Sequence, residues 1–145
     1  MSLQNLVGVS LESVTPSKQT IGRLLEGAAR HIADAKVKAV SAETRYGSAY
    51  TAIRMLADVG LHAHGYRTLT SKPGHHQTAI QTLPLTLGLD PQVVVRLDAL
   101  RKQRNLTEYT GDTIPEATVA ECLSQAETLY GTATAWLKAN RPELI

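Results

Sequence analysis

Apolar side chains recur at helical spacing in four long stretches of the chain. They predict helices over residues 15–40, 42–62, 90–110 and 113–137, because positions three and four apart share one face of a helix. A shorter helical pattern over residues 75–87 contains a proline that must break or kink it near its end. Each predicted helix can therefore bury one side and expose the other.

Three of the predicted helix starts carry residues that can cap free backbone amides. Thr15–Pro16 and Asp90–Pro91 each combine a capping side chain with a proline suited to the first helical turn. Thr113–Glu116 has the spacing of a capping box. At the far ends, Gly65 suits the left-handed conformation that ends a helix, and Gly111 closes the helix over residues 90–110.

These patterns favour an all-α fold. Mostly short connections make successive helices antiparallel, so we expect an up-and-down four-helix bundle with one additional short helix. The longest connection is the turn-rich segment 65–74. We expect residues 1–14 to form a flexible or extended arm and residues 15–145 to form a single helical domain. Helix faces rich in alanine allow close approach, and a surplus apolar face would support a homodimer.

Composition restricts the classes of protein to which this chain can belong. A net charge of +2 over 145 residues is too small to indicate a nucleic-acid-binding protein, so any basic patch must be local. The single cysteine, Cys122, excludes an internal disulfide and a cysteine zinc site, and suits a reducing compartment. Because there is neither an apolar run of spanning length nor a signal-peptide pattern, we expect a cytoplasmic protein with no membrane partner.

Polar chemistry concentrates at the end of the helix predicted for residues 90–110. Val93, Leu97 and Leu100 form an apolar stripe, and the next position on that stripe is Arg104. A row of side chains that faces the core therefore ends in a guanidinium.

Arg104 lies on a ridge with Arg101, Asn105 and Glu108, which project together from the last two turns of that helix. This group can contact a phosphate. The same spacing also suits a solvated helix end with ion pairs between residues four apart, which needs no ligand. The spacing alone leaves both interpretations open.

The segment RKQRNLTEYTGD, Arg101–Asp112, resembles the signature of the HEPN superfamily, and the GYR and GHH tripeptides that follow the second helix resemble one bacterial subset of it. The resemblance covers residues 18–137. It implies a four- or five-helix bundle that dimerises and brings together two copies of an arginine-x(4 to 6)-histidine motif. In active members this composite site cleaves RNA without metal, with the arginine stabilising phosphate charge and the histidine transferring protons.

One position departs from that pattern. Arg104 matches the motif arginine and Asn105 matches the polar residue that often follows it, but Tyr109 stands where the histidine is expected. Tyrosine exchanges protons poorly near neutral pH, because its reference pKa is about 10 against about 6.5 for histidine. In some toxin members a tyrosine two residues after the histidine accepts a nucleotide from a nucleotidyltransferase, and Gly111 holds that position here.

Four of the five histidines flank the 65–74 segment. These are His62, His64, His75 and His76. Their spacing is a poor metal site, because residues two apart on a helix do not share a face, and we expect neither metal nor cofactor. They could make polar contacts at helix ends, or His75 or His76 could supply the missing proton donor if either one reaches Arg104.

We therefore predict a HEPN-like domain that binds RNA or nucleotides and is catalytically degenerate. The predicted ligand-binding residues are Arg101, Arg104, Asn105, Glu108 and Tyr109. The alternatives are a divergent, toxin-like, metal-independent endoribonuclease, or a protein-interaction module that pairs with a nucleotidyltransferase. For catalysis, the candidates are Arg104, Tyr109, His75 and His76. The sequence contains none of the GxGxxG, GxxxxGK or GxSxG motifs, so it gives no support to dinucleotide-binding, P-loop or α/β-hydrolase chemistry.

Overall fold

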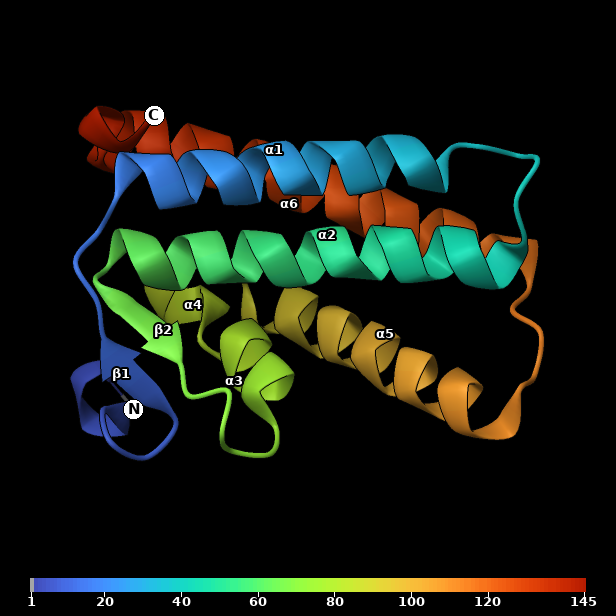
Figure 1. Cartoon of the computed structure of the whole chain (residues 1–145), viewed down its shortest axis with the longest axis horizontal. Helices are drawn as coiled ribbons and strands as arrows, with labels where there is room; N and C mark the ends of the chain where they lie inside the picture. The colour runs from blue at the N-terminus through green and yellow to red at the C-terminus, as the bar shows by residue number, and fades with distance from the viewer. Residues whose placement is uncertain (1) are drawn as a thin grey trace.

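The computed structural model describes residues 2–145, and helices carry most of this part of the chain (Figure 1). The α-helices are α1 (Lys18–Ala35), α2 (Ala42–Ala63), α3 (His75–Gln81), α4 (Leu83–Thr86), α5 (Pro91–Thr110) and α6 (Glu116–Asn140). Short 3-10 helices lie at Gln4–Leu6 and Pro142–Leu144. The strands β1 (Leu11–Ser13) and β2 (Tyr66–Thr68) pair antiparallel in a two-stranded sheet.

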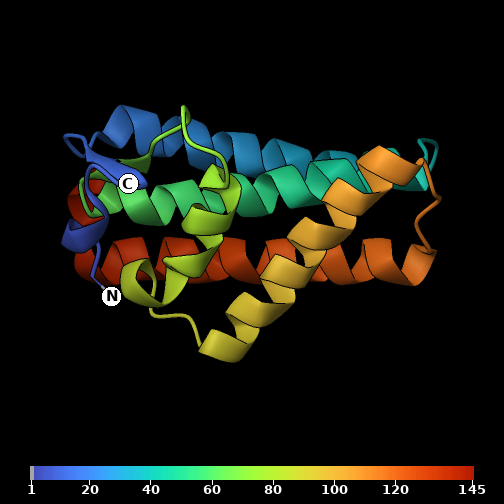
Figure 2. The same ribbon diagram turned by 90° about the horizontal axis from the view of Figure 1, so that it is seen from below.

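The long helices do not all follow one direction. Helices α1, α2 and α6 run lengthwise side by side, with α2 in contact with both of the others. Helix α5 crosses beneath α2 obliquely, as the second view shows (Figure 2). The short helices α3 and α4 lie beside α5, on the same side of α2, and contact both long helices. This oblique course leaves room for polar side chains between α5 and α2.

The prediction of a mainly helical chain is confirmed, and so are several helix ends. Asp90 caps α5, since its carboxylate accepts a hydrogen bond from the Gln92 amide at 2.8 Å. Gly65 and Gly111 both adopt positive φ angles, +87° and +71°; Gly111 directly follows α5, and Gly65 follows His64, the C-cap of α2. The predicted break near Pro84 falls at Thr82, between α3 and α4, and Pro84 lies in the first turn of α4.

The predicted bounds of the first helix were wrong at both ends. Ser17 rather than Thr15 is the cap, because its hydroxyl accepts from the Thr20 amide at 3.2 Å. The helix ends at Ala35, five residues before the predicted Val40. Val37 and Val40 are 46% and 39% exposed, so the apolar pattern beyond Ala35 has no partner to bury it.

The predicted capping box of the last helix was also wrong. Pro115 occupies the cap position and no side chain bonds the free amides there. Glu116 is turned toward α2, where both of its carboxylate oxygens accept hydrogen bonds from Arg45. A tertiary ion pair has replaced the local one that Thr113–Glu116 suggested.

The N-terminal arm predicted for residues 1–14 is structured in its described part. Residues 11–13 form β1, and Leu11 is fully buried. Its partner β2 lies in the segment that was predicted to be a loop. Three-residue strands give almost no periodic signal, which is why an all-α pattern missed this sheet.

The core is centred on α2. Twelve of the 22 residues of α2 are buried, and they pack against α1, α6 and the short helices. Close packing is marked at Gly60, where a Cβ atom would lie 2.6 Å from Thr86 Oγ1. Within residues 2–145, no helix combines the length and the apolarity that crossing a membrane requires.

Candidate functional site

The polar end of α5 lies against the middle of α2. Leu97 and Leu100 are buried, and they fix the rotation of α5 so that Arg104 points toward α2. The Arg104 guanidinium carbon lies 5.4 Å from the centre of the Tyr50 ring. This distance is within the range of a cation–π contact, which holds the cation over a buried ring. The side chain of Arg104 is still 31% exposed.

Each arginine of the ridge has a carboxylate partner on its own helix. Arg101 Nε donates to Asp98 Oδ1 at 2.8 Å, and Arg104 Nη2 lies 3.2 Å from Glu108 Oε1. These ion pairs agree with the interpretation of a solvated helix end, which needs no ligand. A guanidinium has five N–H donors, however, and one carboxylate does not occupy them all.

Helix α3 brings two histidines to the same place. The rings of His75 and His76 lie edge to face with centroids 4.4 Å apart, and His76 lies 6.3 Å from the Tyr50 ring. Together with Arg101 and Asn105 they line a recess of about 220 Å³ between α3 and α5. We call this space the histidine–arginine recess. Gly74 and Gln77 complete its lining.

The environment of His76 favours its neutral form. Desolvation by burial is the main cause, and electrostatic repulsion from Arg54, His75, Arg104 and Arg101 adds to it, so that the pKa of His76 falls to about 4. His76 is therefore uncharged at neutral pH. A neutral imidazole can accept a proton or a hydrogen bond.

A carboxylate on α2 is perturbed in the opposite sense. Burial raises the pKa of Asp58 to about 6, although Arg54 and His75 partly offset the rise. Arg54 Nη1 lies 3.3 Å from Asp58 Oδ2. Titratable groups whose pKa values move in opposite directions are a mark of functional sites, although ion pairs of purely structural value also produce them.

Tyr50 lies against Arg104 and His76, and its hydroxyl forms no hydrogen bond within the described residues. The hydroxyl is buried, and burial raises its pKa to about 12. The Arg104, Arg101 and Arg54 cations act against that rise. A buried polar atom without a partner is rare in native proteins and calls for an explanation.

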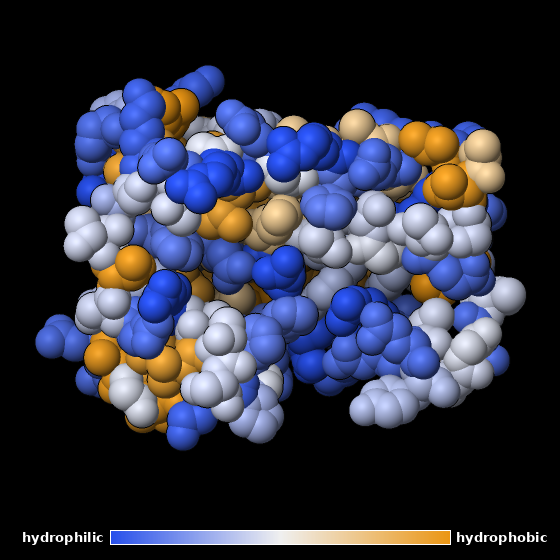
Figure 3. Space-filling view, in the orientation of Figure 1, coloured by the Kyte–Doolittle hydropathy of each residue, from blue (hydrophilic) through white to orange (hydrophobic). Residues whose placement is uncertain are grey.

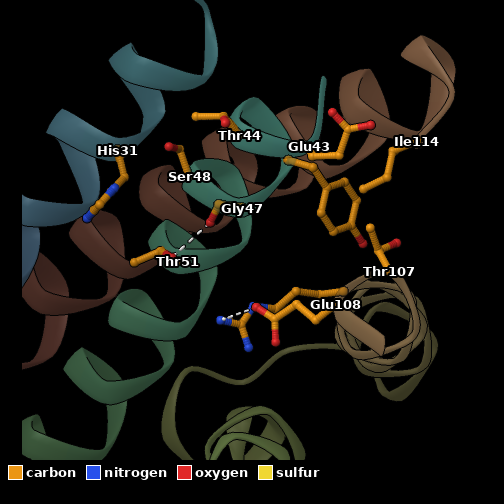
Figure 4. A pocket seen from close by; sticks show the side chains of 11 residues that line it. His31, Glu43, Thr44, Gly47, Ser48, Thr51, Thr107, Glu108 and Ile114 are labelled. Carbon is orange, nitrogen blue, oxygen red and sulfur yellow. Dashed lines mark hydrogen bonds and ion pairs between the residues drawn. The ribbon is translucent and has the colours of Figure 1, made fainter. Parts of the chain in front are cut away.

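A larger cleft of about 420 Å³ opens on the other side of Arg104 (Figure 4). His31 of α1 forms one wall, and residues 43–51 of α2 form the floor. Arg104, Thr107 and Glu108 of α5 form the opposite wall, and Ile114 closes one end. We call this space the hydroxyl cleft, because four of its lining residues are threonine or serine. On the molecular surface, strongly hydrophilic residues gather in the middle of this face, between α2 and α5 (Figure 3).

The structure separates the other predicted site residues from the recess. Tyr109 is 92% exposed and lines neither the recess nor the hydroxyl cleft. Glu108 lines the hydroxyl cleft. His64 Nε2 donates to the Thr86 carbonyl at 2.8 Å, and its ring packs on Trp136. Among residues 2–145, no three side chains of the histidine, cysteine, aspartate and glutamate types lie close enough to hold a metal ion.

Several residues of the site were not predicted from the sequence. Tyr50 and Arg54 were not among the predicted site residues; Tyr50 packs in the core, and the charges of Arg54, Arg101 and Arg104 all act on its hydroxyl. Asp58 and His31 were not predicted as site residues, because nothing in their spacing distinguishes them from the other polar residues of α2 and α1. His31 reaches the cleft because α1 packs along α2.

Comparison with known proteins adds no relative: no family model, curated protein or solved structure matches this chain.

Proposed function

We propose that this chain is a HEPN-like helical domain that binds RNA or nucleotides, with the phosphate held in the histidine–arginine recess next to Arg104. The single observation that carries this proposal is the meeting of His75 and His76 with Arg101 and Asn105 around one recess. Two different helices, α3 and α5, supply these groups. In the part of the chain that the structure describes, no carboxylate lines the recess, so its lining suits an anion.

The charge of the site supports a phosphate over other ligands. Arg54, Arg101 and Arg104 all lie close enough to His76 to lower its pKa. Planar guanidinium groups bind phosphate through two parallel N–H donors, and the neutral imidazole adds a hydrogen bond that does not need a second charge. Four-helix bundling and homodimerisation are further parts of the proposal, and they rest on the resemblance at residues 101–112.

The test is binding of a short single-stranded RNA and of AMP to the Arg104→Ala variant. A lost charge-assisted hydrogen bond is worth about 1.5–3 kcal/mol, so affinity should fall about 10- to 100-fold. Arg96→Ala is the matched control, because Arg96 is an exposed residue of α5 that lines neither space. Equal affinity of the wild type and Arg104→Ala, with both folded, would contradict the proposal.

A metal-independent endoribonuclease is a second candidate function, and the place of His75 and His76 beside Arg101 favours it. A neutral imidazole would accept the 2′-hydroxyl proton, the 2′-oxygen would attack the adjacent phosphorus, and the bond to the 5′-oxygen would break. A second, protonated imidazole would give its proton to the leaving 5′-oxygen. The products would be a 2′,3′-cyclic phosphate and a 5′-hydroxyl.

Incubation of RNA with the protein and excess EDTA separates the two candidates. If the protein is a ribonuclease, the wild type should give these products, and neither His75→Ala nor His76→Ala should give them. Binding without cleavage leaves the first candidate, in which the histidines only hold the phosphate.

A further inference from the structure

The hydroxyl cleft plays no part in a site that holds only a phosphate. Its polar lining differs from that of the recess. Hydroxyl groups come from Thr44, Ser48, Thr51 and Thr107, and carboxylates come from Glu43 and Glu108. Among residues 2–145, Arg104 is the only lysine or arginine in the lining. A free phosphate would therefore meet two like charges there, whereas an uncharged polyhydroxyl group would meet acceptors and donors.

Two residues, one on α2 and one on α1, shape this space. Gly47 leaves the floor of the cleft without a side chain, and a Cβ atom at this position would meet no heavy atom within 4 Å. On the facing wall, Nδ1 of His31 is buried and has no hydrogen-bond partner in the described residues. A bound molecule reaches this nitrogen only when the His31 ring turns toward the cleft. In Figure 4 the side chains of His31, Ser48 and Thr51 lie on the side of the cleft opposite Thr107 and Glu108.

Arg104 connects the cleft to the recess. It lines the cleft directly, and its neighbours Arg101 and Asn105 line the recess. The Tyr50 ring lies under Arg104 and next to His76, so the two spaces share this corner of the fold. A ligand with a phosphate at Arg104 can thus extend a neutral part into the cleft and keep its charge at the cationic side.

We propose that the hydroxyl cleft takes the nucleoside part of a nucleotide whose phosphate is bound at Arg104. This inference rests on the proposed function and names the ligand of the same site. Carboxylates accept hydrogen bonds from the hydroxyls of a ribose, as an acidic residue does in dinucleotide-binding folds, and Glu43 and Glu108 are placed for this. The volume of about 420 Å³ lies within the range of small-molecule sites. The nucleotide is either free or one residue of an RNA strand.

Gly47→Leu tests this inference, because leucine suits a helix, a Cβ atom at this position meets no heavy atom within 4 Å, and the longer side chain would occupy the floor of the cleft. Gly131→Leu is the matched control, an exposed glycine of α6 whose Cβ would also meet nothing within 4 Å. The probes are AMP, inorganic phosphate and a short single-stranded RNA, measured by calorimetry. Thermal melts of both variants check that the fold is intact.

The wild type should bind AMP at least about tenfold more tightly than inorganic phosphate. Gly47→Leu should reduce AMP affinity to the level of phosphate and leave phosphate affinity unchanged, while Gly131→Leu behaves as the wild type. If only the RNA binds, and Gly47→Leu weakens it about tenfold or more, the nucleotide is part of a strand and the inference stands.

Two results would overturn the inference. AMP and phosphate could bind the wild type equally, or Gly47→Leu could bind AMP and RNA as the wild type does. Either result leaves the proposed function intact as long as Arg104→Ala still weakens binding about 10- to 100-fold. Failure of the proposed function is a different outcome, in which none of the three probes depends on Arg104.

Discussion

The polar groups in the first turns of α2 have hydrogen-bond partners within the chain, whereas those in the middle of α2 are poorly paired. In the first turns, Arg45 donates to Val40 O at 3.2 Å and to both carboxylate oxygens of Glu116 at 2.8 and 2.6 Å. Next to it, the Tyr46 hydroxyl donates to the Leu100 carbonyl at 2.7 Å. The guanidinium and the hydroxyl both have direct partners within the chain, so this region needs no ligand.

The middle of α2 lacks such partners. The Tyr50 hydroxyl has none, although Tyr50 is as deeply buried as Tyr46 at 1% exposed. Arg54 forms one ion pair, of 3.3 Å, with Asp58. Arg104 likewise forms one ion pair, of 3.2 Å, with Glu108. Buried polar groups usually find partners, so a cluster of poorly satisfied ones indicates a place where something else binds.

Replacing each tyrosine with phenylalanine tests this difference most sharply, through the free energy of unfolding. Tyr46→Phe should lower the free energy of unfolding by about 1 kcal/mol, because it removes a buried hydrogen bond to a carbonyl. Tyr50→Phe should cost almost nothing or stabilise the fold, because it removes a buried hydroxyl that has no partner. Urea unfolding of both variants beside the wild type measures the difference.

An equal loss in both variants would remove the distinction between the two regions. A loss confined to Tyr50→Phe would reverse it. Because the two substitutions delete the same atom from the same residue type on one helix, they control for each other.

The pH dependence of stability gives a smaller effect. The pKa of His76 is lowered to about 4, so between about pH 4 and 6.5 the folded protein holds fewer protons on this ring than the unfolded chain does. The stability due to His76 is therefore present above about pH 6.5 and is lost as the pH falls through about 4. His76→Gln should lose less stability than the wild type on acidification from pH 7 to 4.

Asp58 should show the opposite sign. The pKa of Asp58 is raised to about 6, so its contribution is present below about pH 4 and is lost as the pH rises through about 6. Asp58→Asn should therefore lose more stability than the wild type on acidification from pH 7 to 4. Urea midpoints at several pH values check both variants, and parallel curves for all three proteins would contradict the perturbed environment.

Much of the fold was predictable because it depends on local patterns. The stripe Val93, Leu97 and Leu100 correctly indicated which side of α5 faces the core, and Asp90 correctly indicated where α5 begins. The errors occurred where a distant partner decides the local structure. Glu116 pairs with Arg45 rather than capping its own helix, and β1 exists only because β2 lies beside it.

The candidate site was predictable only in part. The ridge of Arg101, Arg104 and Asn105 follows from spacing along one helix, so the sequence was sufficient to place these residues together. Whether His75 and His76 reach that ridge depends on how α3 packs against α5, and no periodicity within either helix specifies that contact. The hydroxyl cleft needs three helices at once, which is why His31 and Gly47 gave no signal.

The most direct test of the central claim is a nuclear magnetic resonance titration of labelled protein with AMP and with a short RNA. The account predicts saturable chemical-shift changes that are largest at the side chains of Arg101, Arg104, Asn105, His75 and His76. It would be contradicted by saturable binding whose largest changes lie elsewhere, for example at the space lined by Gly88, Leu89 and Gln125 between α5 and α6. An absence of changes with both ligands would contradict it as well.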